Sequence, residues 1–337
     1  MRTTIRPAAL LALVALLAAC TSGASPSPSA SAAASPSSAA SPTSAASPSA
    51  SAEVSASASA EASASAEPSA SASACATDSL ATRTPGTLTI GTDNPAFPPY
   101  FAPREGGNTE PWDPSQGDPT TGEGFESAAA YAIAEELGFA MEDVEWVVVP
   151  FANSFAPGEK EFDFTINQVS FKEERTQNAD LSEGYYFGNQ AVVVAEDGAF
   201  AAATTLTELK EAKLGAQVGT TSFDAIEQGI QPTQEASVYD TNDLAIEALE
   251  AGQIDGIVVD LPTAFFIIFV QTEGNAVIGQ IGEDVGAEAQ PFSLVLEKDS
   301  PLTDCVNEAI LALGEAGALD ELVEEWLEDD TVPELQP

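Results

Sequence analysis

The sequence contains no histidine, 3 cysteines and only 10 basic residues against 53 acidic ones in a chain of 337. Without histidine it can form neither a Ser-His nor a Cys-His nucleophile pair, although carboxylate catalysis stays open. A net charge of -43 leaves no basic face for phosphate groups, so nucleic acid is excluded as a partner. Soft metal ligands are scarce, and Asp113, Asp118 and Glu123 do not follow the spacing of a calcium loop. We therefore expect no enzyme, metal or cofactor, and we attribute the acidity to solubility or to salty surroundings.

The first 20 residues have the features of an export signal. Arg2 and Arg6 precede an uncharged apolar run at 8–17, which is shorter than the roughly 20 residues that a membrane span needs. The run leads into the tetrapeptide LAAC ending at Cys20, which resembles the lipobox of bacterial lipoproteins. That resemblance implies a lipid-modified Cys20 and an extracytoplasmic protein anchored to the outer face of the cell membrane. An ordinary secretory cleavage site beside an incidental cysteine is the alternative.

Residues 21–74 consist almost wholly of Ser, Ala and Pro. Such a segment buries too little apolar surface to offset its ordering entropy, so we predict a disordered tether. The remaining chain, about 260 residues from Cys75, exceeds what one core usually holds, and we expect two lobes in a monomer. With Cys20 lipidated, Cys75 and Cys305 remain as an even pair in an oxidising compartment, which predicts a disulfide.

Patterns typical of strands and helices alternate along the folded part. Strands are expected at 87–92, 144–149, 162–167, 190–195, 214–218, 254–259, 276–281 and 292–297. Helices are expected at 126–137, 172–178, 206–212, 219–229, 241–251, 261–270 (a buried core helix) and, as a pair, 302–327. This alternation favours an α/β fold with mostly parallel sheets. In such sheets ligands bind beyond the carboxyl ends of the strands, where Asp93 and Asp260 lie.

Short motifs in five stretches of the chain follow one another in a fixed order. They are IGTD at 90–93 with FPPY at 97–100, GFE at 124–126, EER at 173–175 with LSEGYY at 181–186, GTTS at 219–222, and VVD at 258–260. From about 87 to 327 their order and spacing resemble family 3 of the bacterial solute-binding proteins, the amino-acid receptors of ABC importers. The resemblance implies a two-lobed fold of the periplasmic-binding-protein type (type II), a cleft that closes by a hinge, and a membrane permease as partner. Lobe 1 would comprise 75–189 and 287–337, and lobe 2 would comprise 190–286.

The resemblance also implies ligand-binding roles for eight residues. Arg175 and the Thr221 N–H would bind the α-carboxylate of the ligand, and Asp260 would bind its α-ammonium. Gln168 and Ser170 would contact ligand backbone groups. The ligand side chain would contact Asp93, Phe97 and Phe151. The sequence departs from the family pattern at Ser127, Lys172 and Gln217 and in an insert at 101–123 that contains Trp112. These departures leave the identity of the ligand side chain open.

The chemistry of a zwitterion supports this site independently of the family. A carboxylate is best held by the planar fork of arginine, and beyond Cys20 only Arg175 lies inside the α/β pattern. The alternatives are a surface ion pair of Arg175 with Glu173 or Glu174, a plain Ser or Thr N-cap for the helix after Gly219, helix capping by Asp260, a turn at Asp93, and core packing of the aromatic residues.

The polar residues Asp93 and Gln168 favour an amino acid with a polar or cationic side chain. A quaternary or aromatic ligand, a surface solute sensor with the same fold and a periplasmic dehydratase-like enzyme remain as alternatives.

Overall fold

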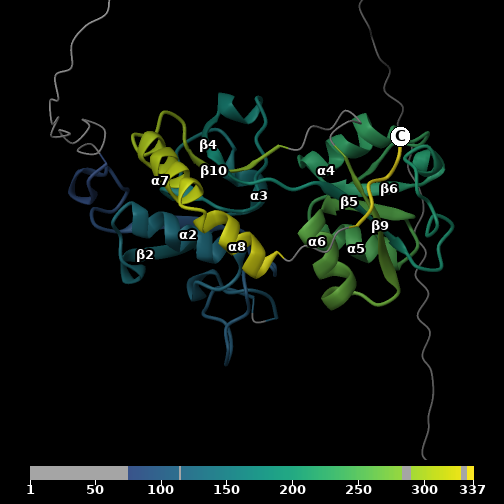
Figure 1. Ribbon diagram of the computed structural model, residues 1–337, viewed down its shortest axis with the longest axis horizontal. Helices are drawn as coiled ribbons and strands as arrows, with labels where there is room; N and C mark the ends of the chain where they lie inside the picture. Colours follow the sequence, from purple (N-terminus) through teal and green to yellow (C-terminus); the bar gives the residue numbers. More distant parts are fainter. Residues whose placement is uncertain (1–74, 114, 283–289, 328–331) are drawn as a thin grey trace, which may run out of the picture. The chain divides into compact units, whose positions relative to one another are not determined.

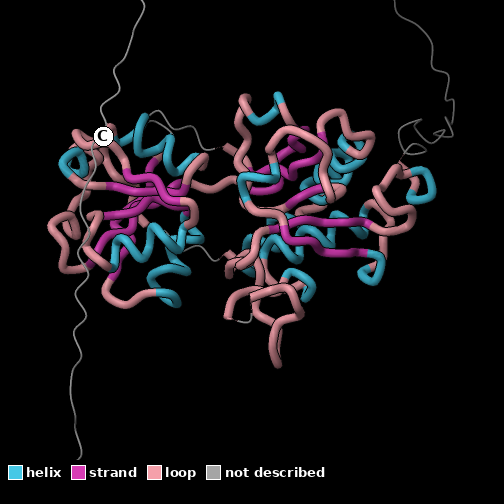
Figure 2. Tube along the Cα trace, turned by 180° about the vertical axis from the view of Figure 1, so that it is seen from behind, coloured by secondary structure: helices cyan, strands magenta, loops and turns pink. Residues whose placement is uncertain are grey.

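The computed structural model describes residues 75–113, 115–282, 290–327 and 332–337. The predicted signal peptide (1–20) with Cys20 and the predicted tether (21–74) lie outside these residues. The described residues belong to one compact unit and carry two five-stranded sheets, visible as two groups of strands in Figure 2. Within the described ranges, every helix is too short or too polar to reach across a bilayer.

The first sheet has the strand order β2-β1-β3-β10-β4. Its strands are β1 (Leu88–Thr92), β2 (Val144–Val148), β3 (Phe164–Thr165), β4 (Ala179–Tyr186) and β10 (Phe292–Glu297). β1 is parallel to β2 and β3, whereas β10 is antiparallel to β3 and β4. Three helices of this part, α2 (Phe125–Glu136), α7 (Thr303–Glu315) and α8 (Ala318–Trp326), pack against one another (Figure 1), and the short α3 (Phe151–Ser154) follows β2. We call this sheet with its helices the first lobe.

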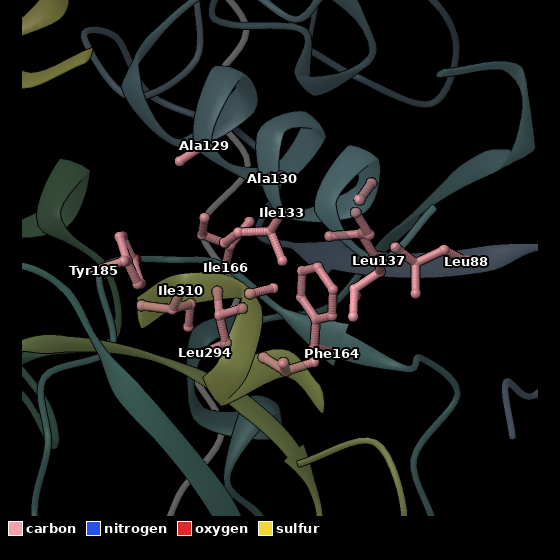
Figure 3. Close-up of a cluster of buried hydrophobic side chains, with 14 of the residues drawn as sticks. Leu88, Ala129, Ala130, Ile133, Leu137, Phe164, Ile166, Tyr185, Leu294 and Ile310 are labelled. Carbon is pink, nitrogen blue, oxygen red and sulfur yellow. The ribbon is translucent and has the colours of Figure 1, made fainter. Parts of the chain in front are cut away.

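The core of the first lobe lies between the sheet and helices α2 and α7. Figure 3 shows Ile133 of α2 and Ile310 of α7 beside Phe164 and Leu294 of the sheet, and all four are at most 2% exposed. Burial of each such side chain contributes about 1.5–3 kcal/mol. The predicted disulfide between Cys75 and Cys305 is present, and it fixes the start of the described chain to α7.

The second sheet has the strand order β7-β6-β8-β5-β9 and forms the second lobe. Its strands are β5 (Gln190–Ala195), β6 (Leu214–Gln217), β7 (Ser237–Tyr239), β8 (Gly256–Asp260) and β9 (Asn275–Ile281). One face packs against α4 (Thr221–Asp224) and the π-helical turn Ala225–Ile230. The other face packs against α5 (Asn242–Glu250), α6 (Leu261–Phe266) and the π-helical turn Ile267–Gln271. Successive residues of β5 enter opposite cores, as the two-residue period of a strand requires.

Several predicted elements differ from the structure. Four of the eight strand pairings are antiparallel, so the expectation of mostly parallel sheets is wrong. All four involve β5 or β10, which are the strands at which the chain enters each sheet from the other and which run antiparallel to both of their neighbours. The helices expected at 172–178 and 206–212 are shorter 3-10 turns, Arg175–Gln177 and Glu208–Glu211. The segment 261–270 is buried only in part, because Phe269 and Val270 are each 69% exposed.

The last described residues, 332–337, lie on the second sheet, although 287–337 was expected in the first lobe. Gln280 of β9 donates to the Pro333 carbonyl at 3.0 Å and accepts from the Leu335 N–H at 2.9 Å. Leu335 is 3% exposed and packs over Gly279, where the absent side chain leaves room for it. The chain thus passes between the two sheets three times: from β4 to β5, from β9 to β10, and from α8 to this tail.

Candidate functional site

A cavity of about 50 Å³ lies where β1, β3, β6 and β8 end. Its wall contains all eight residues to which the sequence assigned ligand binding: Asp93, Phe97, Phe151, Gln168, Ser170, Arg175, Thr221 and Asp260. The lining is completed by Asn167, Gln217, Thr220, Ser222, Asn242 and Val259. Both lobes contribute, so the cavity lies between them, at the strand ends where ligands of such sheets bind.

Arg175 is 5% exposed, which contradicts the alternative of a surface ion pair. Its guanidinium lies 4.3 Å from the ring centroid of Phe155 and 5.6 Å from that of Phe151. It donates to the Ser170 carbonyl, and across the lobes to the Gly219 carbonyl at 2.8 Å. Burial lowers the pKa of Arg175 to about 10, and nearby carboxylates oppose this shift. The group therefore remains a cation at neutral pH.

Asp260 ends β8 and accepts a hydrogen bond at 2.6 Å from the side-chain amide of Gln190. Gln190 in turn accepts from the Ser222 hydroxyl at 2.5 Å. Although Asp260 occupies the N-cap position of α6, its side chain makes no capping bond, so the capping alternative does not hold. Burial raises the pKa of Asp260 to about 6, while the Gln190 bond and the Arg175 charge lower it. The site therefore presents an anion within the field of a fixed cation.

Thr221 begins α4, but the N-cap is the preceding residue. Thr220 accepts from the Phe223 N–H at 3.2 Å, which leaves the Thr221 hydroxyl beside the Ser170 hydroxyl at 3.1 Å. This pair joins the lobes next to Arg175.

Asp93 has a structural function as well as a place on the cavity wall. Its carboxylate accepts from the Asn94 N–H at 2.8 Å, as the turn alternative requires, and from the Phe151 N–H at 3.0 Å. Burial raises its pKa, against these two bonds. Trp112 is buried at 3% exposure and is not part of the cavity lining.

Two residues that hold the site in place received no role from the sequence. Gln190 is directly opposite Asp260 because of the antiparallel register of β5 and β8, which no local motif reveals. Glu126 belongs to the GFE motif, and it binds the backbone N–H of Gln168 at 2.7 Å from outside the cavity. The GFE motif drew attention to Glu126, but the sequence did not show that its carboxylate is hydrogen-bonded to Gln168.

Comparison with known proteins gives consistent matches. The arginine-binding extracellular protein ArtP of Bacillus subtilis is 23% identical over 64% of this chain and 82% of its own length. The glutamate-binding protein GluB of Corynebacterium efficiens is 24% identical over 59% of this chain and 68% of its own length. The structure of an ancestral arginine-binding protein bound to arginine superposes with a TM-score of 0.56 at 26% identity, covering 72% of this chain and 98% of that one.

The matched relatives are binding proteins, and their fold is the two-lobed type expected from the motifs. The profile of one family matches residues 105–329, which is more than half of the chain. The chain therefore belongs to the bacterial extracellular solute-binding proteins, family 3.

Proposed function

We propose that this chain is the substrate-binding component of an ABC importer and that it captures an amino acid with a polar or cationic side chain. The observation that carries the proposal is the presence of a buried cation, Arg175, and an anion, Asp260, on the wall of one cavity. The names of the relatives, which refer to arginine and glutamate, support an amino acid as the ligand.

The ligand carboxylate would accept hydrogen bonds from Arg175, with the hydroxyls of Ser170 and Thr221 beside it. Hydrogen bonds to a charged group contribute about 1.5–3 kcal/mol each. The ligand ammonium would bind Asp260, which Gln190 holds in place. The Nδ2 atom of Asn167 is buried at the wall and has no hydrogen-bond partner among the described residues, so a ligand acceptor would satisfy it.

Closure of the two lobes would accompany binding. Arg175 and Ser170 of the first lobe bond directly to Gly219 and Thr221 of the second, so a ligand carboxylate would exchange with these contacts. The hinge would include the connection at 187–189, between β4 and β5. In this proposal the monomer is lipid-anchored through Cys20, the tether gives it reach, and a membrane permease receives the amino acid. The protein is then a receptor and no enzyme.

Thermal unfolding of the full chain against the proteinogenic amino acids tests the proposal. Ligand at 100 times its Kd stabilises by about 2.7 kcal/mol, so we expect one or a few amino acids to raise the midpoint. The matched controls are the N-acetyl and the carboxamide derivatives of the same amino acid, which block one charged end each and should lose the shift. If no amino acid raises the midpoint, or if both blocked derivatives are as effective as the parent, the proposal is wrong.

A further inference from the structure

A fully buried carboxylate lies directly behind the cavity. Glu126, the second residue of α2, is 0% exposed and is absent from the cavity lining. One of its oxygens accepts from the Gln168 N–H at 2.7 Å and from the Tyr185 hydroxyl at 2.5 Å. Its other oxygen accepts from the side-chain amide of Gln168. Three donors therefore converge on this one group.

Gln168 connects Glu126 to the cavity. Its φ of 46° lies in the left-handed region, which residues other than glycine seldom adopt. Such a conformation persists only where the surroundings hold it. Here both the backbone N–H and the side-chain amide of this cavity residue bond to Glu126. The direction in which Gln168 presents itself to a ligand is therefore set by Glu126.

Ionisable groups face Glu126 from several elements. Burial raises the pKa of Glu126 to about 7, the bonds from Tyr185 and Gln168 lower it, and the charge of Asp260 raises it further. Asp260 has its own raised pKa of about 6, with Arg175 as the cation that favours its charged form. The phenols that interact with this pair are Tyr100, Tyr185 and Tyr186. Two neighbouring carboxylates thus compete for ionisation close to neutral pH.

We propose that Glu126 is a positioning residue of the ligand site, whose ionised carboxylate fixes Gln168 for amino-acid binding and thereby makes the affinity depend on pH. This inference rests on the proposed function, because it needs a ligand ammonium at Asp260. An ammonium there offsets the repulsion between Asp260 and Glu126, so the complex favours the ionised form of Glu126 and binding releases a proton. Affinity consequently increases as the pH rises through the neutral range.

The first test needs no ligand. In the 15N-labelled full chain, the amide resonance of Gln168 is followed by NMR from about pH 5 to about pH 9, a range that brackets a group titrating near neutrality. We expect a titration near pH 7 in the wild-type protein and none near pH 7 in Glu126→Gln, where Asp260 still titrates at lower pH. In Tyr185→Phe the midpoint should move upward, because a bond that favours the ionised carboxylate is lost. The proposal is wrong if the Gln168 amide resonance of the wild type does not change with pH. It is also wrong if this resonance titrates in Glu126→Gln as it does in the wild type.

The second test is calorimetric binding of L-arginine, L-glutamine and L-glutamate to the full chain. For the amino acid that binds, wild-type affinity should rise by about fivefold or more between about pH 6.5 and about pH 8, the lower end of usual coupling factors. Glu126→Gln should bind with a constant affinity over this range. Glu136→Gln removes an exposed carboxylate from the same helix and should retain the wild-type profile.

A Glu126→Gln variant that retains the pH dependence of the wild type contradicts the positioning role. If the wild type binds none of the three, the other proteinogenic amino acids are tested in turn. If none of them binds, the ligand assignment fails instead, and the Gln168 amide titration alone decides the role of Glu126.

Discussion

Arg175 and Asp260 hold opposite charges on one cavity, and neighbouring side chains fix both. Phe151 and Phe155 flank the guanidinium, and Gln190 with Ser222 orients the carboxylate. An arginine enclosed in this way presents its planar donor fork in one direction, which suits a carboxylate better than a lysine ammonium does. The charge pattern of the site therefore depends on neutral residues as much as on charged ones.

Replacement of Glu126 by Gln should change how stability depends on pH. Burial raises the folded pKa of this acid from its ordinary 4.5 to about 7, so between these values the folded state retains a proton that the unfolded state has lost. Its contribution to the free energy of unfolding is complete below pH 4.5 and is lost as the pH rises to about 7. The difference between wild type and Glu126→Gln should therefore fall by about 3 kcal/mol across that window.

Denaturant unfolding of both proteins at several pH values measures this difference. Asp260 is common to both, so to first order its own titration cancels. A difference that stays constant with pH would show that Glu126 titrates in the folded protein as it does in the unfolded chain.

The sequence predicted the residues of the cavity wall better than the residues behind them. The family resemblance selected eight residues that the structure brings to one cavity, and their roles toward a ligand remain predictions. The sequence did not predict a role for Gln190, because its contact with Asp260, 70 positions along the chain, depends on the register of two strands. The sequence did not predict the role of Glu126 either. The role of a buried carboxylate in a helix becomes clear only when the three groups that donate hydrogen bonds to it are known.

At the scale of elements, long periodic segments were predicted and short ones were not. The helices α2, α5, α7 and α8 appear within one residue of the expected ranges, because each buries apolar side chains against a core. The 3-10 turns at Arg175–Gln177 and Glu208–Glu211 were expected as helices, since three or four residues carry too little periodicity to distinguish the two. The position of the tail was unpredictable for another reason: it depends on the space that the missing side chain of Gly279 leaves for Leu335, which exists only in the folded second lobe.

Gly279→Ala should destabilise the protein by crowding this tail. The added carbon would lie 2.7 Å from Leu335 Cγ and 2.9 Å from the Pro333 carbonyl oxygen. Overpacking of this kind costs about 1–3 kcal/mol, measured as the free energy of unfolding of the full chain. The control is Gly314→Ala in α7, where nothing lies within 4 Å of the added carbon and where stability should increase by up to about 1 kcal/mol.

A double-mutant cycle identifies the tail as the cause. In a Leu335→Ala background, Gly279→Ala should cost less, because its closest clash is removed. An equal cost in both backgrounds would place the effect within β9 itself.

For the whole molecule, the net charge of -43 predicts that salt stabilises the fold. Like charges repel more in the compact state than in the extended chain, and added salt shortens the screening length from about 30 Å at 0.01 M to below about 8 Å above 0.15 M. The thermal midpoint should therefore rise by several degrees between about 0.01 M and about 0.5 M NaCl. KCl should act equally if screening is the cause, whereas a midpoint that falls or stays flat contradicts this account of the acidity.

The most direct test of the central claim is the affinity of the amino acid that binds best, measured by calorimetry on wild type, Arg175→Lys and Arg175→Ala. Loss of the buried guanidinium should cost at least about 2–5 kcal/mol of binding free energy, and lysine should restore only part of it, because it keeps the charge without the planar fork. The unliganded thermal midpoints serve as the control for folding. A cost below about 1 kcal/mol in a folded Arg175→Ala protein would mean that Arg175 does not hold the ligand carboxylate, and the proposed site would be wrong.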